Sequence, residues 1–260
     1  MVSDTLEPPR LTHDQCRAEN LCAVFEKFLS PRDAGRAASV LSRLHHHGLK
    51  RFYVTGRLAL ECHRVLRRER TTPHTLNDVD LVVSGFDAVP GTLAAAFLAI
   101  HIHPKAPPGR LVLQLADPEE RLRIDLFSPY GNTLARSGSL QIGGMPLVSI
   151  EDLAARAAKL CLGLAREEVP RKHAEDFQLL DTWADPAAVE NAWGDHRREG
   201  DPVLFREARA RIYELLQSRP ELLVVPTYSQ DFESVCAKCE QTGVWSLAAK
   251  PLILSCLGHC

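Results

Sequence analysis

The stretch Leu76-Asn77-Asp78-Val79-Asp80-Leu81-Val82-Val83 decides how we interpret this chain. Its apolar, valine-rich run predicts a β-strand. Residues two apart on a strand share a face, so Asp78 and Asp80 point one way while Val79 and Leu81 point the other. Like charges side by side repel, and partial burial raises the cost. The pair therefore indicates a bound divalent cation.

Composition bounds the class of protein. The chain has 260 residues, enough for one large domain or two small ones. Its content of 45% hydrophobic and 25% charged residues is typical of a soluble globular protein, and a net charge of -2 excludes polyanion binding by bulk charge alone. The sequence has neither an apolar run long enough for a transmembrane helix nor a secretory signal, so we expect a cytoplasmic protein without membrane contact.

Periodicity and turn residues predict an α+β fold in which a mixed sheet is flanked by helices. We expect four regions: N-terminal helices over residues 1–49, an α/β core over 50–148, a helical region over 149–220 and a cysteine-bearing module over 225–260. Ser30 and Ser149 are placed to cap helices that follow them. Helices are expected over 11–29, 31–47, 57–70, 90–100, 150–164, 170–183 and 201–218, and extended segments over 51–56, 76–83, 101–105, 110–115, 121–127 and 139–148.

A third carboxylate belongs with the first two. Asp125 lies between Ile124 and Leu126 in an expected strand, where an aspartate is costly unless it is paired or bound to metal. If this strand neighbours the first, three carboxylates converge. Hard oxygen ligands in that number suit Mg²⁺.

A glycine turn precedes the carboxylates in the chain. The expected strand over 51–56 ends at Gly56, and a helix follows at once. The free N–H groups and positive dipole of a helix start attract phosphate. Thr55, Gly56 and Arg57 are therefore nucleotide-binding candidates.

This order resembles the DNA polymerase β-type nucleotidyltransferase superfamily, whose pattern is a Gly-[Gly/Ser] turn, an acidic pair one residue apart and a later third carboxylate. The positions Gly56-Arg57, Asp78-x-Asp80 and Asp125 match it. The segments Val148-Ser149-Ile150-Glu151-Asp152-Leu153, Lys159 and Arg171-Lys172-His173-Ala174-Glu175-Asp176-Phe177 look like the downstream helices of the abortive-infection (AbiEii-like) nucleotidyltransferase toxins. The resemblance covers about residues 50–182.

The resemblance implies an enzyme that uses Mg²⁺ or Mn²⁺ to move a nucleoside monophosphate from an NTP to an acceptor hydroxyl. The acceptor class stays open among RNA such as tRNA, protein and small molecules. Asp78 and Asp80 would hold the metals, and Asp125 would complete the site and help deprotonate the acceptor. Lys159, Lys172 and Asp176 would lie near the nucleotide.

Two other functions stay open. Arg57 stands where the family has a small residue, which favours a catalytically inactive binding module for nucleic acid or a protein partner. The third possible function is that of a toxin that an antitoxin neutralises. The arginine-rich side of helix 57–70 is either a solvated face or a track for RNA.

The eight cysteines fall into two groups. Cys236 and Cys239 are separated by 16 residues from Cys256 and Cys260, an interval typical of a structural Zn²⁺ module such as a zinc ribbon, with His259 as a rival fourth ligand. The other four are expected as small buried hydrophobic residues: Cys16, Cys22, Cys62 and Cys161.

Histidines supply two further expectations. His173 would lie near the site, where it could assist proton transfer. His101 and His103 share a strand face, which we expect to be an exposed edge.

Overall fold

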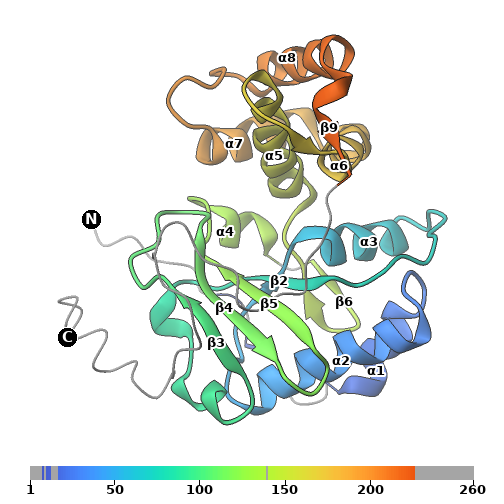
Figure 1. Ribbon diagram of the computed structural model, residues 1–260, viewed down its shortest axis with the longest axis vertical. Coiled ribbons are helices and arrows are strands. Elements are labelled where there is room, and N and C mark those ends of the chain that lie inside the picture. Colours follow the sequence, from blue (N-terminus) through green and yellow to red (C-terminus); the bar gives the residue numbers. More distant parts are fainter. Residues whose placement is uncertain (1–7, 9, 13–16, 139, 226–260) are drawn as a thin grey trace. The chain divides into compact units, whose positions relative to one another are not determined.

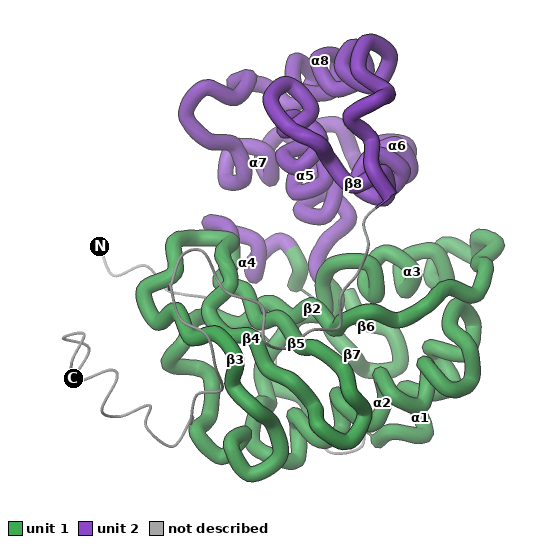
Figure 2. Tube along the Cα trace, in the orientation of Figure 1, with its two compact units in different colours: residues 1–129, 137–147, 230–260 green, residues 130–136, 148–229 purple. Residues whose placement is uncertain are grey.

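The computed structural model describes residues 8, 10–12, 17–138 and 140–225 (Figure 1). The chain forms two compact units (Figure 2). Within the described residues, the first unit comprises those up to Pro129 together with Ser137–Leu147, and the second comprises Tyr130–Arg136 together with those from Val148 onward. The expected mixed α+β class is confirmed. No helix in these described ranges is both long enough and apolar enough to cross a membrane.

A five-stranded mixed sheet organises the first unit (Figure 1). Its spatial order is β1 (Tyr53–Val54), β2 (Asp78–Val82), β5 (Leu122–Phe127), β4 (Leu111–Asp117) and β3 (Leu98–Ile102). Strands β2 and β5 are parallel, and every other neighbouring pair is antiparallel. The parallel pair brings together two segments more than 40 residues apart in the chain.

Alternation along the central strands gives the sheet one apolar face. Val79, Leu81, Ile124 and Leu126 have no exposed surface, whereas the residues between them, Asp80 and Asp125, are acidic. Burying this face removes apolar surface from water and contributes the main stabilisation of the unit. The same alternation leaves the charged side chains together on the other face.

The first unit also contains α1 (Ala18–Phe25), α2 (Pro31–His46) and α3 (Gly56–Leu66), the short 3₁₀ helices η1 (Phe86–Ala88) and η2 (Gly91–Ala95), and the strand pair β6 (Gln141–Ile142) and β7 (Met145–Pro146). The expected start of α2 is confirmed, because the Ser30 hydroxyl accepts a hydrogen bond from the Asp33 N–H at 3.1 Å. Helix α2 is tied to the β4–β5 turn through Arg36, which donates to the carbonyls of Glu120 and Arg121.

The second unit is mainly helical. It contains most of α4 (Thr133–Ser137), then α5 (Ile150–Cys161), η3 (Leu162–Ala165), β8 (Val169–Pro170), α6 (Arg171–Trp183), α7 (Pro186–His196), α8 (Phe205–Ser218), η4 (Pro220–Leu222) and β9 (Leu223–Val224). Strands β8 and β9 pair in parallel. The expected cap of α5 is confirmed by the Asp152 N–H, which donates to the Ser149 hydroxyl at 3.1 Å.

A buried carboxylate stabilises the second unit. Asp152, 1% exposed, accepts hydrogen bonds from Thr133 Oγ1 at 2.7 Å, Ser149 Oγ at 2.7 Å and two nitrogens of Arg136 at 2.7 and 2.9 Å. His196 Nε2 lies 3.0 Å from it. Burial raises the pKa of Asp152, but hydrogen bonds from Arg136 and His196 outweigh burial and hold that pKa well below its ordinary value. The Asp152 carboxyl group is therefore ionised at neutral pH.

The predicted helix over residues 90–100 is wrong in its second half. Only Gly91–Ala95 forms a 3₁₀ helix, and Leu98–Ile102 is strand β3 at the edge of the sheet. A short apolar run fits either a helix or a buried strand by periodicity, so pairing with β4 decides the outcome.

Two other helix starts need correction, and one helix was missed. Helix α1 begins at Ala18 rather than near Leu11, whose N–H instead donates to the Lys50 carbonyl at 2.8 Å. Helix α8 begins at Phe205 rather than Asp201. Helix α7 was not predicted, although Asp185 followed by proline is a strong start signal and its side chain caps the helix.

Candidate metal centre

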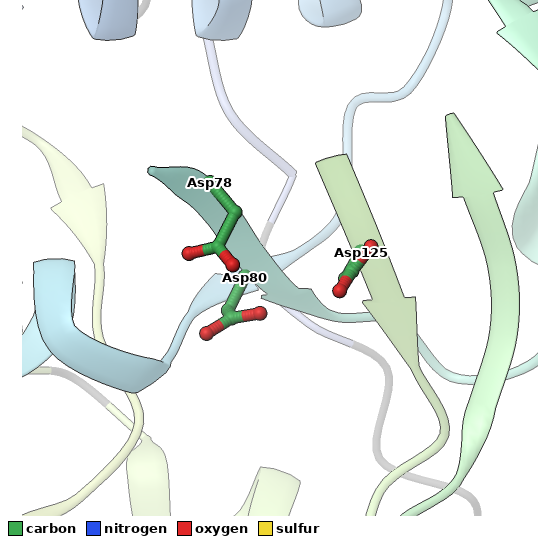
Figure 3. A group of neighbouring side chains, drawn as sticks. All are labelled: Asp78, Asp80 and Asp125. Atoms are coloured by element: carbon green, nitrogen blue, oxygen red, sulfur yellow. The ribbon is translucent and has the colours of Figure 1, made fainter. Parts of the chain in front are cut away.

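Three carboxylates meet on the charged face of the sheet (Figure 3). Asp78 and Asp80 extend from β2, and Asp125 extends from the neighbouring strand β5. One oxygen from each lies within 4.8 Å of the others. Among the described residues, this is the one group of three or more metal-ligating side chains that lie so close together.

Strand register explains the convergence. Asp80 lies directly beside Asp125, and Asp78 lies beside Arg123, in the parallel β2–β5 pair. Partners in register on neighbouring strands project to the same face. Asp125 is the most buried of the three carboxylates, at 9% exposure, while Asp78 and Asp80 are half-buried.

The start of α3 packs directly against one of these carboxylates. Gly56 has φ +64°, and a Cβ atom there would lie only 2.1 Å from Oδ2 of Asp80. The Thr55 N–H donates to the Asp80 carbonyl at 3.0 Å, which fixes the approach of the two segments. Glycine is required here for both its conformation and its lack of a side chain.

The N-cap residue of α3 does not cap the helix with its side chain. Thr55 occupies the N-cap position, but its side chain makes no capping hydrogen bond. The first N–H groups of a helix need partners from side chains, water or ligands. Because Gly56 contacts Asp80, the positive end of α3 lies beside a carboxylate, and helix starts attract negative charge in this way.

Sequence reasoning missed the cation that shares this face. Arg123 Nη2 lies 2.5 Å from Asp78 Oδ2, and Arg123 Nε lies 3.5 Å from Asp125 Oδ2. Burial alone would lower the pKa of Arg123, but the carboxylates of Asp125, Asp78 and Asp80 outweigh it and raise that pKa. Arg123 precedes Asp125 by two positions on a strand, so alternation was a signal that could have identified it.

A neutral neighbour orients the third carboxylate. Gln114 on β4 pairs with Asp125 across the hairpin, and its Nε2 donates to Asp125 Oδ1 at 2.8 Å. The hairpin itself was predicted, but the register that aligns these two side chains was not. Gln114 therefore fixes the rotation of the Asp125 carboxylate.

Arg57 pairs with its own helix. Its Nη2 lies 2.7 Å from Oε1 of Glu61, one turn further along α3, and Glu61 is only 1% exposed. Arg64 lies further from the same carboxylate, at 3.6 Å. A buried glutamate needs such a counter-ion. Arg57 therefore has a structural reason to be an arginine, which the sequence pattern did not reveal.

The remaining predicted nucleotide contacts belong to the second unit. Lys159 on α5 donates to the carboxylate of Asp201. Lys172 and Asp176 lie four residues apart on α6. Beside them, burial, with smaller contributions from Lys172 and Arg156, lowers the pKa of His173 to about 4, so its imidazole is neutral at pH 7. The predicted nucleotide and proton-transfer roles of these residues stay predictions.

The structure also tests the expectations for the cysteines and for the histidine pair. Cys62 and Cys161 are buried as predicted, but Cys22 is half-exposed, and Cys16 lies outside the described residues. The expectation of an exposed histidine pair is wrong for His101, which is 4% exposed. His101 lies beside Gln114 in register, so the polar row of the sheet continues to its edge.

The predicted zinc module cannot be placed. Its four cysteines and His259 lie outside the described residues.

Comparison with known proteins adds no family: no protein-family model matches the sequence, and a search of curated proteins found no match.

Proposed function

We propose that the first unit is the core of a metal-dependent nucleotidyltransferase, which moves a nucleoside monophosphate from an NTP to an acceptor hydroxyl. The observation that supports this proposal best is the contact between Gly56 and Asp80. It joins a helix start suited to phosphate with a carboxylate cluster suited to a divalent cation. Both parts are needed to handle a nucleoside triphosphate.

The donor set fits Mg²⁺ or Mn²⁺. Three carboxylates offer hard oxygen ligands within 4.8 Å of one another, and Asp80 is held in place by the backbone of α3. When bound there, the metal would polarise the reacting phosphoryl group and help orient the acceptor. Asp78, Asp80 and Asp125 are the residues that would hold it.

The chain's own groups would then carry out the remaining steps. The Thr55 N–H is already bonded to the Asp80 carbonyl, so the backbone N–H of Gly56 and the first turn of α3 would bind the β- and γ-phosphates. Asp125, oriented by Gln114, would take the proton from the acceptor hydroxyl. The oxygen of that hydroxyl would then bond to the α-phosphorus. The bond between the α-phosphorus and the bridging oxygen breaks, and pyrophosphate leaves.

The finer assignments belong to the same proposal. The mixed sheet with its flanking helices would be a nucleotidyltransferase-type fold, with Lys159, Lys172 and Asp176 as supporting contacts to the nucleotide. Cys236, Cys239, Cys256 and Cys260 would hold a structural Zn²⁺. RNA, including tRNA, and protein hydroxyls are the acceptor classes to test first.

Transfer of label tests the proposal. The 260-residue chain is incubated with Mg²⁺, each α-³²P-labelled NTP and a cell extract. We expect one NTP to label a macromolecular acceptor, and we expect EDTA or Asp80→Ala to abolish the labelling. The exposed Asp87 offers a matched control, Asp87→Asn, which should label normally. Full transfer by a folded Asp80→Ala protein would rule out the assignment.

One observation favours a second candidate, the non-catalytic binding module. Arg123 already pairs with two of the three carboxylates, as the counter-ion of a purely structural cluster would. Calorimetry separates the two functions. An enzyme should bind an NTP in a Mg²⁺-dependent way that Asp80→Ala removes, whereas the binding module should show no metal-dependent heat.

A further inference from the structure

Arg123 occupies a central position in the carboxylate cluster. It lies beside Asp78 in the β2–β5 register and shares a strand face with Asp125. Its guanidinium contacts one carboxylate on each strand, at 2.5 Å and 3.5 Å. The Arg123 side chain is 34% exposed, so water reaches part of it. Arg123 therefore places a positive charge directly against the carboxylates that would bind a metal ion.

The positive charge of Arg123 bears directly on metal binding. Its guanidinium contacts the carboxylates of Asp78 and Asp125. A divalent ion at the same oxygens would meet that charge, and like charges repel strongly where water is partly excluded.

The hydrogen bonds to Asp78 and Asp125 also bear on metal binding. Asp78 Oδ2 accepts from Arg123, and Asp125 Oδ1 accepts from Gln114. A metal ion at the cluster therefore competes with Arg123 for Asp78. Gln114 is neutral, so it orients Asp125 without adding to the charge.

We propose that Arg123 is the resident cation of this site: it competes with a divalent ion for Asp78 and so lowers the affinity of the cluster for metal. This inference rests on the metal site of the proposed function. It makes Arg123 a residue that sets the affinity for the bound ion, a role that the sequence motif of two aspartates and a third carboxylate does not contain.

Titration of the 260-residue chain with Mn²⁺ tests it, with free Mn²⁺ followed by electron paramagnetic resonance. The wild type gives the reference affinity. Arg123→Gln, which keeps a hydrogen-bond donor but removes the charge, should bind the ion about tenfold more tightly or better. Arg123→Lys restores the charge and should return the affinity toward that of the wild type. Arg67, which pairs with surface Glu69, gives the matched control Arg67→Gln, with unchanged binding.

Thermal melting adds a readout that does not depend on activity. Without metal, Arg123→Gln should melt below the wild type because Asp78 and Asp125 lose their counter-ion, and Mn²⁺ should raise its melting temperature more than that of the wild type. Equal affinity in the wild type and Arg123→Gln would overturn the inference alone. No Mn²⁺ binding by either protein would overturn the proposed function as well.

Discussion

Gly56 and Asp80 are packed so closely that the smallest possible side chain does not fit between them. A Cβ atom on residue 56 would lie 2.1 Å from Asp80 Oδ2 and 2.9 Å from its Cγ. The two residues are 24 positions apart, yet each sets the conformation allowed to the other. The start of α3 and the carboxylate cluster therefore form one structural unit.

Gly56→Ala should destabilise the first unit by about 2–5 kcal/mol, because the left-handed backbone and the steric overlap each add to the cost. Removing the carboxylate relieves the overlap but not the backbone strain. The double variant Gly56→Ala/Asp80→Ala should therefore lose less than the two single variants together, as urea unfolding can measure. The control is Gly35→Ala within α2, where a Cβ meets nothing within 4 Å and should stabilise by about 0.5–1 kcal/mol. Simple additivity would contradict the packing argument.

Arg57→Ala tests whether Arg57 serves the fold or the substrate. It leaves the buried Glu61 carboxylate with Arg64 at 3.6 Å as its remaining ion-pair partner, and should cost about 2 kcal/mol of unfolding free energy. Glu61→Gln in the same chain should recover part of that loss. Arg64→Ala, which removes the more distant partner, should cost less. If Arg57→Ala leaves stability unchanged and only weakens NTP binding, the substrate role is the correct one.

Asp152→Asn should destabilise the second unit strongly. The substitution leaves Arg136 without one of its two carboxylate partners and breaks a fully hydrogen-bonded buried group, a change that typically costs about 3–5 kcal/mol. The exposed Glu199 provides the control Glu199→Gln, which should stay within about 0.5 kcal/mol of the wild type. Chemical denaturation followed by circular dichroism measures both. A loss no larger than that of the control would show that Asp152 does not stabilise the unit.

His173 should make stability fall in mild acid. Its pKa is lowered to about 4 in the folded protein, mainly by burial, whereas an unfolded chain has the ordinary value of 6.5. The unfolded state therefore binds a proton first as pH falls, so the free energy of unfolding decreases from about pH 6.5 down to about pH 4 and is unaffected above that window. His173→Gln should flatten this part of the curve. His74 and His196, whose pKa values burial also lowers, should keep the rest of the slope.

Local sequence predicted those parts of the fold whose cause is local. Ser30 and Ser149 cap helices because a hydroxyl three residues before a free N–H satisfies it, whatever the rest of the chain does. The β4–β5 hairpin follows from two short apolar runs around a turn. The segment that ends in β3 was misread because its apolar residues fit two periodicities, and a partner strand decided between them.

The candidate site also has some features that local sequence determined and others that only tertiary structure determined. The alternation around Asp78, Asp80 and Asp125 determined which face each carboxylate would take, since the period of a strand is a property of the backbone. Which strands are neighbours was decided by tertiary structure, and so were the cation and the amide that share the face, Arg123 and Gln114.

The sequence by itself determined that three carboxylates and a glycine turn belong to strands and a helix start. Only the tertiary structure decided that Asp80 would lie beside Asp125, that Gly56 would pack on Asp80, and that Arg57 would turn to Glu61. The physical reason is the distance along the chain between the residues that interact. Caps and alternation depend on residues a few positions apart, whereas register and ion pairing depend on segments that meet only when apolar surface is buried.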